Sequence, residues 1–302
     1  MNLKNFINDA VAVWIALVLG KLLTHRAGYR LADSVGKWIS NHQHSEMVRA
    51  VKANQWVVHE GKLSAGELDV LTTKVFQSAA RCLFDYFHYI GKPESLLKIT
   101  SFGPEAQQAF ERIRNNQPTV IIVPHLSSFD VMGYALALNN IPVQVLSFPN
   151  PNDAYKMQNK LRRRVGIEIT PMSLSAFRKA RKRLREGGSI LTGLDRPLVG
   201  NQLEKYQPKF FGRETNLPVA YVRLAKEANA PIFIMACISQ SDGSYFLTGS
   251  EAIWVAPKRD LSKEIIFNAE RVLSKAADLI RQRPEQWAMF YPVWPKVLDE
   301  IS

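Results

Sequence analysis

The hydrophobic positions along this 302-residue chain follow two different patterns. Up to about residue 115 they recur every three to four residues, which is the period of an amphipathic helix. From about residue 119 short apolar runs alternate with helical stretches. The first part of the chain therefore predicts helices at 5–39, 45–58, 67–90 and 104–115.

The second part of the chain predicts a sheet. Its apolar runs at 119–123, 143–148, 189–194 and 231–238 alternate with helices expected at 129–138, 154–165, 175–186 and 219–229. Such alternation is typical of βαβ units. Two further strands at 245–248 and 252–255 and a final helix at 261–283 complete the pattern. The predicted fold class is α/β: a mainly parallel central sheet flanked by helices, with a helical N-terminal extension.

The segment 10–20 is uninterruptedly apolar. As a helix it is too short to span a bilayer. Basic residues follow it and no Ala-x-Ala cleavage pattern appears, so a secretory signal does not fit. A helix lying in the membrane interface fits better, with an ordinary buried helix as the alternative. We expect residues 1–40 to form a membrane-associating helix. Residues 41–302 are expected to form a single α/β domain with its helical lead-in.

A histidine follows the strand predicted at 119–123. His125 comes directly after Pro124, and Asp130 falls in the first turn of the next predicted helix. Open α/β sheets bind ligands at the carboxyl ends of their strands. A histidine there can take a proton from a hydroxyl while an aspartate fixes its tautomer. The alternative is a helix N-terminus capped by Ser127 or Ser128, with a histidine that merely packs beneath it.

Charge changes this picture by suggesting a partner. The formal net charge is +12, and the segment 156–185 holds eleven basic residues against Glu168 alone. A solvated helix face is the ordinary explanation, but such density also suits anionic lipid headgroups, an acidic carrier protein or nucleic acid. Nucleic acid is disfavoured because Phe177 is the one aromatic within this segment, on the apolar side. The two cysteines have no metal-binding spacing, so we expect no metal.

Two further segments carry candidate chemistry. Asp195 and Arg196 follow the strand predicted at 189–194, where they either pair with each other or line the same cleft as His125. Further along stands the run Phe210-Phe211-Gly212-Arg213. Its aromatic pair belongs either to the core or to the wall of an acyl groove.

The order of these motifs resembles the bacterial lipid A late acyltransferase family. That family also includes phosphatidylinositol mannoside acyltransferases and belongs to the HxxxxD glycerolipid acyltransferase group. The resemblance covers nearly the whole chain. The motifs that carry it are His125-x4-Asp130, Asp195-Arg196, Phe210-Phe211-Gly212-Arg213, Pro218, Leu224-Ala225, Ala230-Pro231 and Pro284-Glu-Gln-Trp287…Trp294.

The chain departs from the family pattern at two places. Met289 and then Phe290 stand where the family commonly has an aromatic two residues after Trp287. Lys209 stands where an acidic residue often precedes the aromatic pair, and Glu204 lies further upstream. A role for Glu204 in holding the acceptor therefore has less support than the other matches.

The resemblance implies a peripheral or monotopic O-acyltransferase at the cytoplasmic face of the inner (plasma) membrane. It would move a fatty acyl chain from a thioester of acyl carrier protein or CoA to a hydroxyl of a glycolipid or lysolipid, without a further cofactor. His125 would be the general base and Asp130 its orienting partner, with backbone N–H groups near Ser127 or the Arg196 guanidinium as oxyanion donors. The expected substrate-binding residues are Ser127, Ser128, Arg162, Arg163, Arg164, Asp195, Arg196, Glu204, Phe210, Phe211, Gly212 and Arg213.

Other functional classes fit less well. No G-x-S-x-G is present for a serine hydrolase, and neither G-x-G-x-x-G nor a P-loop is present for a nucleotide enzyme. A non-enzymatic, basic, membrane-associated scaffold is the remaining alternative. Such a scaffold would tolerate the loss of His125, whereas the enzyme would not.

Overall fold

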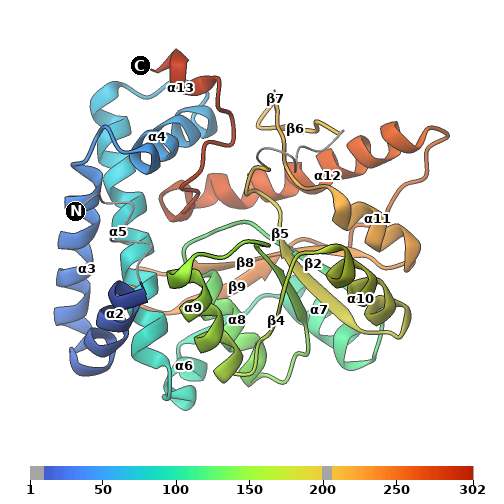
Figure 1. Ribbon diagram of the computed structural model, residues 1–302, viewed down its shortest axis with the longest axis horizontal. Helices are drawn as coiled ribbons and strands as arrows, with labels where there is room; N and C mark the ends of the chain where they lie inside the picture. The colour runs from blue at the N-terminus through green and yellow to red at the C-terminus, as the bar shows by residue number, and fades with distance from the viewer. Residues whose placement is uncertain (1–9, 199–205, 302) are drawn as a thin grey trace.

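The computed structural model describes residues 10–198 and 206–301, and a seven-stranded sheet runs through it (Figure 1). The strand order is β1-β9-β8-β2-β5-β3-β4. All neighbours pair in parallel except β8 and β9. The predicted α/β class with a mainly parallel sheet is confirmed. The strands are β1 Thr100–Phe102, β2 Thr119–Val123, β3 Gln144–Ser147, β4 Glu168–Pro171, β5 Ser189–Gly193, β8 Ile232–Ser239 and β9 Tyr245–Gly249.

Helices cover both faces of the sheet, which explains why its central strands are apolar without alternation. Ile122 and Ile190 pack into one core with α10, α11 and α12. Ile121 and Leu191 pack into the other core with α5, α7, α8 and α9. These helices are α5 Ala65–Tyr89, α7 Pro104–Arg114, α8 Phe129–Leu138, α9 Asp153–Arg164, α10 Leu174–Arg185, α11 Ala220–Glu227 and α12 Leu261–Gln282.

The N-terminal helices stand at one end of the sheet (Figure 1). The helix predicted at 5–39 is two helices, α2 Ala10–Leu22 and α3 His25–Ser40, and residues 5–9 lie outside the described part. The break follows from Thr24, whose hydroxyl caps α3 by accepting from the Ala27 N–H. Small residues let α3 lie close to α5: a Cβ at Gly36 would stand 2.6 Å from the Gln77 backbone.

The C-terminal segment returns to these N-terminal helices. Asn54 on α4 Glu46–Val58 donates to the carbonyls of Met289 and Tyr291, both at 2.9 Å, and accepts from the Val293 N–H at 3.0 Å. One buried asparagine thus holds the last part of the chain, which includes the 3₁₀ turn Pro284–Gln286 and α13 Val297–Glu300.

Several elements differ from the prediction. The predicted strand at 252–255 is reduced to a single bridge between Ile253 and Ile232. The pattern did not indicate β1, β4, the helix α6 Pro93–Lys98, or the hairpin of β6 Lys209–Phe210 and β7 Arg213–Glu214. β1 and β4 are short and end the sheet on either side, where strands carry polar residues and Pro and so lose the apolar signal.

Candidate active site

His125 and Asp195 meet at the carboxyl ends of two neighbouring strands. Val123 of β2 pairs with Gly193 of β5. His125 and Asp195 each follow a member of this pair by two residues, so they leave the sheet side by side. The Nδ1 of His125 lies 2.5 Å from Asp195 Oδ1, and the His125 N–H donates to Oδ2 at 2.8 Å. Asp195 is fully buried, whereas 29% of the His125 side chain is exposed. Because a carboxylate only accepts, Nδ1 carries the proton and Nε2 is left as the basic nitrogen.

Asp130 has a different partner from the one predicted. Its two oxygens accept from Arg162 Nε at 2.6 Å and Nη2 at 3.0 Å. The expected contact between Asp130 and the His125 ring is therefore wrong, because the first turn of α8 directs this carboxylate towards α9. The ring is instead held from the neighbouring strand.

Arg162 is a structural cation in this arrangement. It is 5% exposed and also donates to Asn159 at 2.8 Å, so the expectation that it binds substrate is not supported. Burial acts to lower the pKa of this guanidinium, but Asp130 outweighs burial and raises the pKa. Its charge lies 5.6 Å from the Phe129 ring centre, and that ring packs edge-on against His125. The Asp130–Arg162 pair thus supports the histidine through Phe129.

Trp287 is the third member of the His125 group. Its indole Nε1 donates to Asp195 Oδ2 at 2.7 Å, and the ring is 1% exposed. The following N–H, of Ala288, donates to the His125 carbonyl at 2.9 Å. The sequence indicates Trp287 only through the family resemblance. A physical argument adds that the N–H of a buried indole needs a hydrogen-bond acceptor.

The aromatic pair of the second motif lies behind Trp287. Phe210 is 1% exposed and stacks on Trp294, with ring centres 5.8 Å apart, while Phe211 lies 6.1 Å from Trp287. Neither ring lines the cavity described below, so the core alternative is the one found. Phe211 and Gly212, both with positive φ, form the two-residue turn of the hairpin. Arg213 pairs with Glu300 at 2.8 Å.

The two serines after His125 are used inside the protein. Ser127 donates its N–H and its hydroxyl to the Gln286 carbonyl, at 2.7 and 2.8 Å. The Ser127 N–H itself is therefore not available as an oxyanion donor. Ser128 is fully buried at the start of α8, and its hydroxyl contacts Cys82 Sγ at 3.2 Å rather than capping the helix.

Arg196 lies between two aromatic rings at the site. Its guanidinium carbon stands 3.6 Å from the Phe148 ring centre and 4.2 Å from that of Tyr291. Its Nη2 also donates to the Tyr291 hydroxyl at 2.9 Å. Arg196 does not pair with Asp195. It lines the same cavity as His125, as one of the two expectations had it for both residues, whereas the buried Asp195 does not line that cavity. Glu204 lies outside the described residues.

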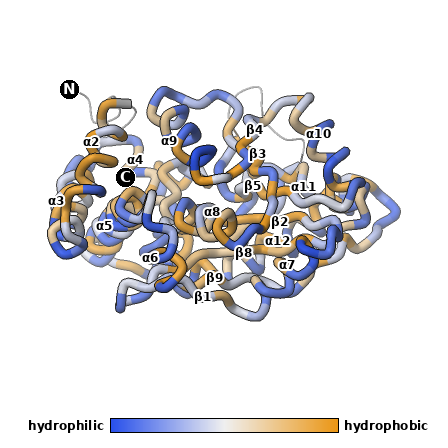
Figure 2. The backbone as a smooth tube through the Cα atoms, turned by 90° about the horizontal axis from the view of Figure 1, so that it is seen from below, coloured by the Kyte–Doolittle hydropathy of each residue, from blue (hydrophilic) through white to orange (hydrophobic). Residues whose placement is uncertain are grey.

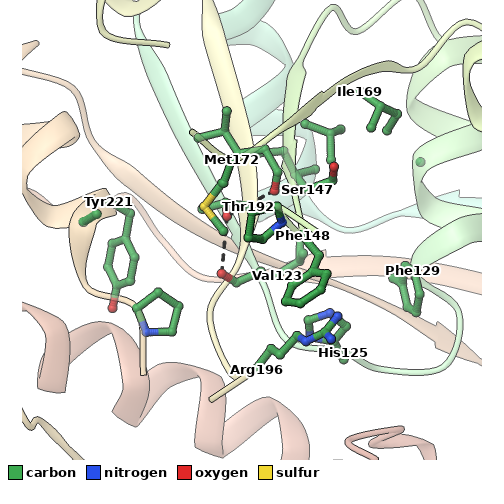
Figure 3. A pocket seen from close by; sticks show the side chains of 18 of the residues that line it. Val123, His125, Phe129, Ser147, Phe148, Ile169, Met172, Thr192, Arg196 and Tyr221 are labelled. Carbon is green, nitrogen blue, oxygen red and sulfur yellow. Dashed lines mark hydrogen bonds between the residues drawn. The ribbon is translucent and has the colours of Figure 1, made fainter. Parts of the chain in front are cut away.

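An apolar cavity of about 370 Å³ opens beside His125 (Figure 3). The cavity lies at the carboxyl ends of the strands and reaches both faces of the sheet. Val145 and Leu191 line it on the α8 side, and Tyr221 and Leu224 line it on the α11 side. A smaller cavity of about 150 Å³ adjoins the α8 side and shares the lining residues Gly133, Val145, Ile167 and Leu191.

Comparison with known proteins agrees with this geometry. The family described as bacterial lipid A biosynthesis acyltransferase matches residues 4–296. The chain belongs to this family. It is also similar to two phosphatidylinositol mannoside acyltransferases. That of Mycolicibacterium smegmatis is 26% identical over 180 residues, or 58% of this chain and 56% of the relative. That of Mycobacterium tuberculosis is 25% identical over 186 residues, or 60% and 56%. The chain thus spans little more than half the length of these relatives.

The basic segment of this lipid A acyltransferase family member is partly neutralised within the protein. On α10, Lys179 and Arg183 pair with Glu168, and Arg181 pairs with Glu227. Arg163 and Arg164, two of the predicted substrate-binding residues, are exposed on α9. The excess positive charge is therefore a surface feature, separate from the buried Arg162.

The outer side of α2 carries exposed apolar residues. Val11, Trp14 and Leu22 are 60%, 57% and 76% exposed, and the helix is apolar along most of its length (Figure 2). Over the described parts of the chain, none of the helices combines the length and apolar character needed to cross a membrane.

Proposed function

We propose that this protein is an O-acyltransferase with His125 as its general base. It moves a fatty acyl chain from a thioester of acyl carrier protein or CoA to a hydroxyl of a glycolipid or lysolipid. The observation that carries this proposal is the His125–Asp195 pair at the wall of an apolar cavity. Membership of the acyltransferase family supports it, and the names of the relatives favour a glycolipid acceptor.

The reaction needs no covalent enzyme intermediate. Nε2 of His125 takes the proton of the acceptor hydroxyl, whose oxygen attacks the thioester carbonyl carbon. Asp195 keeps the ring in the required tautomer and stabilises the imidazolium. Arg196, on the cavity wall, is a candidate donor to the oxyanion. The thiolate leaves and receives the proton from His125.

The cavity suits an acyl chain. Its volume of about 370 Å³ is within the usual range of small-molecule sites, about 300–1,000 Å³. Burial of a hydrocarbon chain in it is favourable by about 0.8 kcal/mol per methylene. This binding energy is independent of the chemistry at His125, so the site can hold the chain while the thioester carbonyl is attacked.

Peripheral association with an anionic membrane surface, at the cytoplasmic face of the inner membrane, forms the second part of the proposal. The exposed apolar residues of α2 would insert at the interface, and the exposed Lys21 and Arg26 would meet headgroups. The wild-type protein should sediment with anionic vesicles. A smaller fraction of a Trp14→Ser variant should sediment with them. Equal sedimentation of the two proteins would argue against α2 as the contact.

The enzymatic proposal is tested by acyl transfer from labelled donors into membrane lipids. Wild type, His125→Ala and a control at the exposed surface residue His42, His42→Ala, are compared after their folding is checked. We expect His125→Ala to lose about two to four orders of magnitude in rate and His42→Ala to match the wild type. A folded His125→Ala protein with the wild-type rate would contradict the proposal. Absence of transfer by every protein would favour the non-enzymatic scaffold.

A further inference from the structure

A buried hydroxyl without a partner lies on the wall of the cavity. Ser147, the last residue of β3, is 6% exposed. Within residues 10–198 and 206–301 its Oγ has no hydrogen-bond partner, although its carbonyl accepts from the Met172 N–H at 2.9 Å. Folded proteins nearly always pair such groups, because a buried unpaired hydroxyl is unfavourable. On a cavity wall this points to a ligand atom as the missing partner.

The strand register places Ser147 beside the His125 ring. β3 and β5 pair Leu146 with Thr192, so the next residue, Ser147, lies beside Gly193. The ring stands directly over Gly193, where an added Cβ would lie 2.8 Å from His125 Cε1. Neighbouring strands are about 4.8 Å apart, so the hydroxyl can reach an atom held at His125. Both residues belong to the same cavity wall (Figure 3).

Ser147 also lies on the side of the sheet where the smaller cavity continues. Residues two apart in a strand share a face, so Ser147 faces the same side as Val145. Val145 lines both the main cavity and its smaller neighbour. An acyl chain on this side would therefore begin next to the Ser147 hydroxyl.

The reaction needs a donor to the carbonyl oxygen, and several of the backbone N–H groups beside His125 are engaged within the protein. Four N–H groups after β2 are engaged: those of His125, Leu126, Ser127 and Phe129 donate to Asp195, Pro124, Gln286 and Leu126, respectively. Arg196 has part of its donor capacity committed to Tyr291. The Ser147 hydroxyl has its full capacity to donate.

We propose that Ser147 is a catalytic residue whose hydroxyl donates a hydrogen bond to the thioester carbonyl oxygen. The inference rests on the proposed acyl transfer. As the acceptor oxygen forms its bond to the carbonyl carbon, its proton passes to His125 Nε2 and the carbonyl π pair moves onto the oxygen. Ser147 stabilises that oxyanion. When the carbonyl reforms, the C–S bond breaks, and the thiolate leaves with the proton from His125. Ser147 keeps its own proton throughout.

The first test compares Ser147→Ala with a matched variant, Ser189→Ala. Ser189 is the first residue of β5, at the end of the strand remote from Gly193. It is likewise buried, and its hydroxyl is unpaired among the described residues, but it does not line the cavity. We expect Ser147→Ala to lower kcat by about 100-fold with the donor KM little changed. Ser189→Ala should turn over at the wild-type rate. An unchanged kcat in a folded Ser147→Ala protein would overturn the inference.

A second test reads the hydrogen bond without turnover. His125→Ala and the double variant His125→Ala/Ser147→Ala are each saturated with an acyl thioester labelled with ¹³C at the carbonyl. Infrared difference spectra should show a lower carbonyl frequency in the single variant, because a hydrogen bond from Ser147 weakens the C=O bond. Equal frequencies would overturn the inference. A purely structural role for Ser147 would not move this band.

A comparison of acyl donors distinguishes two roles of the Ser147 hydroxyl, activation of the carbonyl and recognition of the chain. Unsubstituted and 3-hydroxylated acyl donors should lose activity equally in Ser147→Ala, since both have the same carbonyl. A loss confined to hydroxylated donors would assign Ser147 to chain recognition and overturn the inference. Wild-type protein that transfers no acyl group from any donor would remove the proposed function itself. An active wild type with an equally active Ser147→Ala variant would remove this inference alone.

Discussion

Trp287 donates its indole N–H to the same carboxylate of Asp195 that holds the His125 ring. The C-terminal segment, the strand end of β5 and the residues after β2 therefore meet in one group. Asn54 of α4 keeps that segment in place. The N-terminal helices thus support the dyad through the end of the chain.

Loss of the indole N–H should lower activity even when an aromatic ring is kept at position 287. Trp287→Phe removes one charge-assisted hydrogen bond to Asp195, of a kind that contributes about 1.5–3 kcal/mol. We expect kcat/KM to fall by about 10- to 100-fold in acyl-transfer assays. Trp254→Phe, at a half-exposed tryptophan, is the control and should match the wild type. Equal rates for the two variants would show that the bond to Asp195 does not matter for catalysis.

The Asp130–Arg162 pair should act mainly on stability. Asp130→Asn leaves a buried guanidinium without its counter-charge, which costs about 3–5 kcal/mol. Urea unfolding of the purified protein should show a decrease of that size in the free energy of unfolding. Asp278→Asn, in the exposed pair with Arg281, is the control and should change stability by less than about 1 kcal/mol. A decrease for Asp130→Asn no larger than that of the control would contradict this assignment.

The junction of α3 with α5 should weaken as the pH rises. The hydrogen bond to buried Asp85 raises the pKa of His25 above its usual value of 6.5, outweighing the opposing effect of burial. A group with a raised folded-state pKa stabilises fully below its unfolded pKa and loses that effect as pH rises through the folded value. The unfolding free energy of wild type should therefore exceed that of His25→Gln most below about pH 6.5.

The difference in unfolding free energy between wild type and His25→Gln should shrink as the pH rises above about 6.5. Thermal or urea unfolding of both proteins across the same buffers measures it. The carboxylate also accepts from the hydroxyls of Tyr29 and Tyr245. Both hydroxyls stay protonated in this range because burial, and after it Asp85, raises their pKa values. A difference independent of pH would mean that His25 acts only by packing.

The cavity on the α8 side should determine which chain is transferred. Val145 lines both cavities, so Val145→Phe fills the passage between them and Val145→Ala widens it. With a mixture of acyl donors, we expect the Phe variant to shift the product towards shorter chains and the Ala variant towards longer ones. Mass spectrometry of the lipid products reads this directly. A chain-length distribution unchanged in both variants would place the acyl chain on the α11 side.

The sequence predicted those features that depend on local periodicity. Alternating strands and helices gave the parallel sheet, and the position of His125 after β2 placed it at the edge where ligands bind. The partner of His125 was predicted wrongly. Asp130 is close to His125 along the chain, whereas Asp195 is brought there by the pairing of β2 with β5. Register between strands cannot be read from one strand alone.

The other misses have the same origin. Arg162 lies in a basic run and looks like a surface cation, yet it is buried because α9 turns that one residue inward to Asp130. The sequence left Phe210 and Phe211 open between the core and an acyl groove, because the Trp287 and Trp294 on which they pack lie more than seventy residues away in the sequence. Ser147 has no sequence signal at all, because its importance comes from a missing partner and a neighbouring cavity.

The most direct test of the account is acyl transfer by Asp195→Asn beside Asp130→Asn, each at a temperature where it is folded. Loss of the Asp195 charge should reduce the rate by about three to four orders of magnitude, because the imidazole loses its fixed tautomer. Asp130→Asn, once folded, should retain much more of its activity. The opposite order, with Asp130→Asn inactive and Asp195→Asn close to wild type, would contradict the His125–Asp195 dyad.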